Sequence, residues 1–121
     1  MRRLHATALT MLGAALAATL AAAPAQAAPG DTMTLCGSVR TPAGWVDVNW
    51  GISGSCGATT SPNVKMVKQL TGLPVGTTVN ACATTYPPAG WVQVSSYYSS
   101  GCQAFLNPSL NPNAWTLRRV S

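Results

Sequence analysis

The chain has 121 residues, only 7% of them charged, and a formal net charge of +5 at neutral pH. Its few cations are scattered and form no dense basic patch, so we expect no nucleic-acid partner. Its only histidine is His5 and it has no glutamate, although general acid–base catalysis and metal binding depend heavily on these residue types. We therefore expect no catalytic residues, no cofactor and no metal site.

Residues 1–27 form a predicted signal peptide. Arg2 and Arg3 are followed by an uncharged run rich in alanine and leucine, which ends in the small-residue pattern Ala25-Gln26-Ala27. This order is typical of export with cleavage after Ala27. A membrane anchor is the alternative, but the run is mainly alanine and ends in a cleavage pattern, so we expect no stable membrane anchor. The sequence predicts a secreted bacterial protein that is extracellular or in the cell envelope.

The segment left after cleavage, residues 28–121, consists of two sequence repeats. Residues 30–56 align with residues 76–102 without a gap, and both contain the pentapeptide PAGWV. Self-similarity of this kind indicates a repeated structural unit. Because the link between the units is short, we predict a single β domain made of two repeats, about residues 30–75 and 76–121.

Four cysteines occupy equivalent positions in the two repeats: Cys36, Cys56, Cys82 and Cys102. An oxidising compartment and a small domain favour two disulfides, and four cysteines allow three pairings. A unit that was once independent had to close its own bridge. The duplication therefore favours Cys36–Cys56 and Cys82–Cys102, and pairing between the repeats is the alternative.

Alternating apolar and polar residues predict β-strands in each repeat. In the first repeat, strands cover residues 31–36 and the residues after the turn at 41–44, where Pro followed by Gly is typical of a hairpin loop. Residues 63–70 and 113–120 fit a strand or a helix, and β-branched residues favour a strand. Each repeat is then a three-stranded antiparallel meander. Two meanders packed about a pseudo-twofold axis predict an all-β, disulfide-stapled sandwich or small barrel.

The hairpin pairing also predicts which side chains face the core. The inner face carries the valines of both hairpins: Val46, Val48, Val92 and Val94. The outer face carries the candidate binding residues of both repeats: Trp45, Asp47, Asn49, Trp91 and Gln93. Two further candidates, Tyr97 and Tyr98, lie in a serine-rich loop whose composition is typical of a recognition surface.

Exposed aromatic residues beside hydrogen-bonding groups are typical of a binding site. The sequence therefore predicts a small non-catalytic binding module whose extracellular partner is a polysaccharide, a cell-wall component or a protein. A secreted inhibitor or toxin-like effector acting on an enzyme or a membrane is the alternative, because a rigid disulfide framework suits both. For Trp45 and Trp91, the alternative to exposure is burial over their own Pro-Ala-Gly turns, the commoner fate of tryptophan in a small domain.

Overall fold

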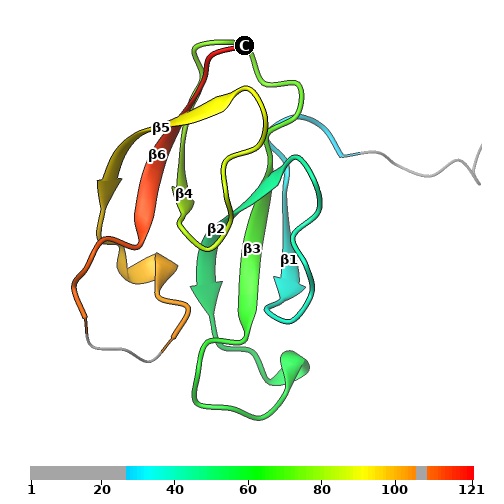
Figure 1. Ribbon diagram of the computed structural model, residues 1–121. Helices are drawn as coiled ribbons and strands as arrows, with labels where there is room; N and C mark the ends of the chain where they lie inside the picture. Colours follow the sequence, from blue (N-terminus) through cyan, green and yellow to red (C-terminus); the bar gives the residue numbers. More distant parts are fainter. Residues whose placement is uncertain (1–26, 106–108) are drawn as a thin grey trace, which may run out of the picture.

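The computed structural model describes residues 27–105 and 109–121. The predicted signal peptide, apart from Ala27, lies outside the described residues. The described chain forms six strands and two short 3-10 turns (Figure 1). The strands are β1 (Thr32–Cys36), β2 (Trp45–Gly51), β3 (Val64–Gln69), β4 (Thr78–Cys82), β5 (Trp91–Tyr97) and β6 (Ala114–Arg119); the turns are η2 (Gly54–Cys56) and η3 (Ser100–Cys102). The strands predicted for residues 63–70 and 113–120 are confirmed by β3 and β6.

Each repeat forms its own three-stranded antiparallel sheet, with the strand orders β1-β3-β2 and β4-β6-β5. The last strand of each repeat is therefore central, and the predicted meander order is wrong. Cys36 at the end of β1 lies opposite Val64, whereas Trp45 at the start of β2 lies opposite Gln69. The link between β1 and β2 thus runs the length of β3. A turn does form here, but one residue later than predicted. The Trp45 N–H donates to the Pro42 carbonyl (3.1 Å), so the turn covers residues 42–45, and it leads into β2 without closing a hairpin.

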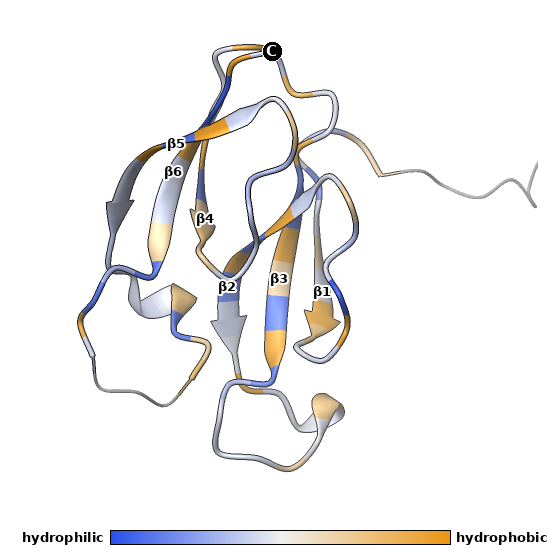
Figure 2. Cartoon of the chain, viewed as in Figure 1, coloured by the Kyte–Doolittle hydropathy of each residue, from blue (hydrophilic) through white to orange (hydrophobic). Residues whose placement is uncertain are grey.

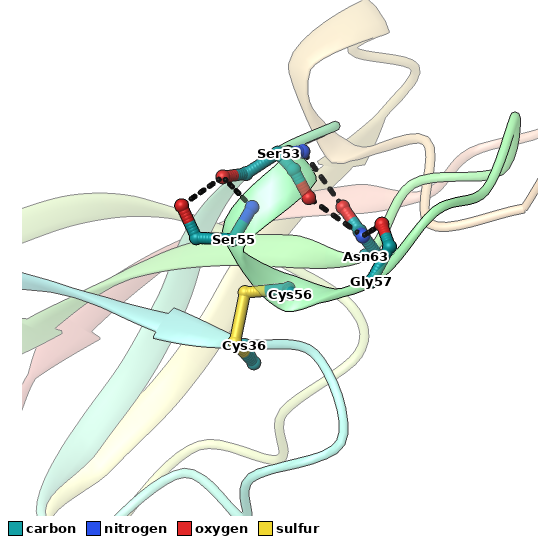
Figure 3. Close-up of a disulfide and its surroundings, with 6 residues drawn as sticks. All are labelled: Cys36, Ser53, Ser55, Cys56, Gly57 and Asn63. Atoms are coloured by element: carbon teal, nitrogen blue, oxygen red, sulfur yellow. Dashed lines mark hydrogen bonds between the residues drawn. A yellow bond between two sulfur atoms is a disulfide. The ribbon is translucent and has the colours of Figure 1, made fainter.

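Both disulfides close within one repeat, as the duplication favours: Cys36–Cys56 and Cys82–Cys102, each with a sequence separation of 20. In the first repeat the bridge ties η2, in the loop between β2 and β3, to the end of β1 (Figure 3). The chain then returns as β3 between β1 and β2. Two disulfides are compatible with an exported protein. Within residues 27–105 and 109–121, no helix is long and apolar enough to cross a membrane.

A repeated asparagine fixes the loop that leads into each central strand. The Asn63 amide oxygen accepts from the Ser53 N–H (2.8 Å), and its amide nitrogen donates to the Ser53 carbonyl (2.9 Å), as Figure 3 shows. Asn113 forms the same two hydrogen bonds with Ser99, at 2.8 and 2.9 Å. Both loops therefore use one amide side chain to satisfy backbone groups that no neighbouring strand reaches.

The buried faces of the strands differ from the hairpin prediction. Asp47, predicted to face solvent, lies opposite Val67 of β3, and both are buried. In the second repeat Trp91 is buried, whereas Val92 and Val94 are exposed. The prediction failed because the other repeat, whose Thr84 and Thr85 contact Asp47, decides which side chains are covered, and because the neighbour of β2 is β3 and not β1. In addition, β2 and β5 each contain a mid-strand bulge, and one extra residue inverts the alternation that follows it.

The main core lies between the two sheets and draws on both repeats. Its buried members are Val46, Leu70, Val79, Ala81, Trp91 and Leu117. Because the sheets stay separate and share this core, the arrangement is sandwich-like. The main contacts between the repeats join β2 to β4 and η3. A twofold axis would equally join β5 to β1, but these strands lie at opposite sides of the molecule (Figure 1), so the predicted pseudo-twofold packing is wrong.

Candidate functional site

The two PAGWV segments form equivalent tight turns. The N–H of Trp45 donates to the carbonyl of Pro42, and the N–H of Trp91 donates to that of Pro88, both at 3.1 Å. The glycine of each turn has a positive φ, 84° at Gly44 and 87° at the equivalent position of the second repeat, which a side chain would disfavour. The pentapeptide therefore acts first as a structural device, because it makes the same turn twice.

A surface hollow of about 570 Å³ lies between these two turns. Its aromatic members are Trp45, at the start of β2, and Tyr86, which precedes the second turn. Trp45 is half-buried, whereas Tyr86 is 87% exposed. The remaining wall consists of the prolines and alanines of both turns and of threonine residues. We call this site the aromatic hollow.

The hydroxyl groups of the aromatic hollow belong to Thr41, Thr71 and Thr85. Thr41 donates to the carboxylate of Asp47 (2.5 Å), and Thr85 accepts from the backbone N–H of Asp47 (3.1 Å). Thr71 is exposed at the rim. The hollow therefore combines two aromatic rings with hydroxyl groups, a combination suited to a ligand that has both C–H faces and hydrogen-bonding groups.

A second cleft, of about 560 Å³, contains a buried ion pair beside Trp50. Lys65 Nζ lies 3.6 Å from the carboxylate of Asp47 and donates to the Thr41 hydroxyl (2.7 Å). The Asp47 carboxylate also accepts from Thr84 (2.6 Å), whose hydroxyl accepts from Trp50 Nε1 (3.1 Å). Each threonine hydroxyl thus donates once and accepts once. A buried charge is tolerated when it is paired and hydrogen-bonded in this way.

The second repeat carries no charges at the two positions aligned with this ion pair. The residues aligned with Asp47 and Lys65 are Gln93, which is exposed, and Trp115, which is half-buried. The indole N–H of Trp115 is buried and has no hydrogen-bond partner within the described part of the chain. Because Thr84 and Thr85 come from the second repeat, the network connects the repeats to each other.

The predicted binding residues do not gather on one surface. Trp45 lines the aromatic hollow, whereas Trp91 belongs to the main core and Asp47 to the buried network. The polar candidates Asn49 and Gln93 are exposed on β2 and β5. Tyr97 and Tyr98 are half-buried, and Tyr97 packs against the cluster around the second disulfide.

Tyr86 is the aromatic residue that the sequence prediction missed. It is aligned with Arg40 in the first repeat, so it lies outside the repeated pattern. The available signal was its position directly before a proline turn that also leads to a tryptophan. Only the folded chain brings Tyr86 to the same hollow as Trp45.

Within residues 27–105 and 109–121, no group of three or more His, Cys, Asp or Glu side chains could hold a metal ion. A scan against protein-family models finds no match, and searches of curated proteins and of solved structures find none either. The case for a function therefore depends on the geometry of the chain itself.

Proposed function

We propose that this chain is a small exported, non-catalytic binding module that takes a polysaccharide of a cell wall in the aromatic hollow. The observation that carries the proposal is Tyr86, which is 87% exposed and shares a hollow with Trp45. So exposed a ring contributes little buried area to the stability of the domain, and a ring that lines a solvent-facing hollow can contact a ligand. The C–H face of a sugar packs on such a ring with little loss of side-chain entropy.

The surroundings of the two rings support a sugar ligand. The hydroxyls of Thr71 and Thr85 line the same hollow and can exchange hydrogen bonds with sugar hydroxyls. The two proline turns hold the rings on a rigid base, which reduces the cost of ordering the site on binding. The non-catalytic assignment is supported by Asp47, whose carboxylate is engaged by two threonines and a lysine.

The test is a pull-down with insoluble polysaccharides and cell-wall fractions, followed by titration of tryptophan fluorescence with the retained glycan. We expect Tyr86→Ala to weaken binding about tenfold, because truncating a stacked aromatic residue typically costs 1 kcal/mol or more. Trp45→Ala should weaken it in the same direction. The matched control is Phe105→Ala, which removes an aromatic side chain that is 76% exposed but lies outside the aromatic hollow.

Equal affinities of the Tyr86→Ala and Phe105→Ala variants would overturn the proposed site. Failure of every glycan fraction to retain the protein would overturn the ligand class. Inhibition of a secreted hydrolase by both the unchanged protein and the Tyr86→Ala variant would favour the alternative of an inhibitor or toxin-like effector.

A further inference from the structure

The two repeats contact each other through two different surfaces. The first repeat contributes the valine surface, which consists of Val46, Val48 and Leu70. The second repeat contributes the receiving surface, which consists of Val79, Ala81, Thr84, Thr85 and Gly101. Each repeat contains residues aligned with both surfaces. The contact within the chain uses the valine surface of the first repeat and the receiving surface of the second. The aligned residues of the other repeat, one set for each surface, take no part in it.

The unused copy of the valine surface is in the second repeat, and we call it the free valine surface: Val92, Val94 and Val120. In the first repeat Val46 and Leu70 are 0% exposed, whereas the three valines of the free surface are 41, 53 and 50% exposed. The backbone is equivalent, since Leu70 N–H donates to the Gly44 carbonyl (2.9 Å) and Val120 N–H donates to the Gly90 carbonyl (2.8 Å). The local fold of the two repeats is therefore the same here. They differ because the valines of the first repeat are covered by the other repeat and those of the second repeat are not.

The unused copy of the receiving surface is in the first repeat, and we call it the free receiving surface: Met33, Leu35, Ser38, Val39 and Ser55. Val79 and Ala81 are buried, whereas their counterparts Met33 and Leu35 are only half-buried. Val39 is 46% exposed. The free receiving surface thus keeps its apolar character but lacks the cover that its counterpart has.

A pair of aligned residues keeps the room needed for close approach. A Cβ on Gly101 would lie 2.5 Å from the Asn49 side-chain oxygen, so the contact within the chain requires glycine there. The residues aligned with Asn49 and Gly101 are Ser95 and Ser55. A long side chain facing a glycine is thus replaced by two short side chains, which conserves the volume at the contact.

The free valine surface is easier to bury than the valine surface at one position, that of Asp47. Each surface also has a cation opposite its first valine, Lys68 opposite Val46 and Arg118 opposite Val92, so the two do not differ there. Asp47, beside the valine surface, requires Lys65 and two threonines around it. Its aligned residue beside the free valine surface is Gln93, which is neutral. An uncharged amide is far cheaper to remove from water than a carboxylate. Covering the free valine surface therefore needs no counter-ion at this position.

We propose that a second copy of this chain covers these surfaces, with the free valine surface of one chain docked on the free receiving surface of the next. Their strands β5 and β1 lie at opposite sides of the molecule (Figure 1), and Figure 2 shows hydrophobic residues in the first half of β5. Such a contact is head-to-tail, so each added chain presents both surfaces again and the assembly grows beyond two chains. The bulge in β5 interrupts a regular strand edge, so the contact uses side chains and not strand pairing.

The experiment follows the chain, expressed with residues 1–27 in place and recovered after export, by sedimentation velocity from about 10 µM to about 1 mM, the range of weak interfaces. We expect the mass to rise with concentration beyond that of two chains. Val94→Glu and Val39→Glu should each weaken association at least about tenfold, because each places a charge in the contact. The control is Met66→Glu, at a residue of similar exposure (39%) on β3 outside both surfaces, and it should leave association unchanged.

Mixing the two variants separates head-to-tail docking from symmetric docking. Each variant keeps one intact surface, so an equal mixture should form species of two chains and no larger ones. Val94→Thr, which keeps the side-chain shape, should weaken association in the same direction and excludes misfolding as the cause. A chain that stays monomeric at about 1 mM, or a mixture that forms no two-chain species, would overturn the proposal.

Discussion

Asp47 and Gln93 occupy aligned positions with opposite environments. Asp47 is buried and bonded to Thr41, Thr84 and Lys65, whereas Gln93 is exposed on β5. Asp47→Ala leaves Lys65 buried without its anion, so we expect it to lower the free energy of unfolding by about 3 kcal/mol or more. Gln93→Ala should change this free energy by less than about 0.5 kcal/mol. Urea unfolding of both variants, followed by tryptophan fluorescence, measures the difference.

The intermediate substitution is Asp47→Asn, which removes the charge and keeps one oxygen that can accept from a threonine. Its cost should therefore fall between those of the two alanine variants. If Asp47→Ala and Gln93→Ala lowered the free energy of unfolding equally, the buried network would have no stabilising role. Losing the contacts of Asp47 would then cost no more than losing an exposed side chain.

The environment of single residues could not be predicted from the repeated letters. Trp45 and Trp91 stand in identical pentapeptides, yet Trp45 lines a surface hollow and Trp91 is in the core. A turn at this place is a local feature and was predictable, because Pro and Gly favour turns, although it forms at residues 42–45 and not at 41–44. Which ring is covered depends on the other repeat, and that contact has no local signal in the sequence.

At the scale of elements, the two disulfides form a matched pair for experiment. Both close loops of the same sequence separation, 20, so the loss of loop-closure entropy is equal, about 3 kcal/mol. Cys82 and Cys102 are also buried among Ala114 and the rings of Trp50 and Tyr97, whereas the other bridge is half-buried. We therefore expect Ala substitution of Cys82 and Cys102 to cost about 1 kcal/mol more than Ala substitution of the first pair.

Thermal unfolding of the two double variants, followed by circular dichroism, gives this comparison. The first-repeat variant, Cys36→Ala with Cys56→Ala, is the control for loop closure alone. A first-repeat variant that unfolds at the lower temperature would contradict the contribution of the buried sulfur atoms.

Strand positions were predictable, but strand order was not. Alternation of apolar residues located β1 and β4, because a strand with one covered face repeats every two residues, and β-branched residues favoured strands at β3 and β6. Alternation predicts which face of a strand is covered, but it does not predict which strand is its hydrogen-bonded neighbour. The central position of β3 depends on contacts between residues distant in sequence, among them the Cys36–Cys56 bridge and the hydrogen bonds of Asn63. No local sequence pattern indicates how these contacts order the strands.

At the scale of the whole molecule, the two repeats should unfold as one unit. The main core contains Val46 and Leu70 from one repeat beside Trp91 and Leu117 from the other, and the Asp47 network also crosses between them. Separating the repeats would expose both sets of side chains and break the network, so we expect neither repeat to be stable without its partner. The repeats are thus folding partners as well as sequence copies.

We therefore expect a single calorimetric transition at a concentration low enough to keep the chain monomeric, with calorimetric and van't Hoff enthalpies that agree. Val46→Ala removes methyl groups from the shared core, so it should lower the transition temperature without splitting the transition. The control is Val75→Ala, at a residue that is 64% exposed in the link between the repeats and should change little. Independent repeats would instead give two transitions, or a calorimetric enthalpy near twice the van't Hoff value, because each sheet would then melt on its own.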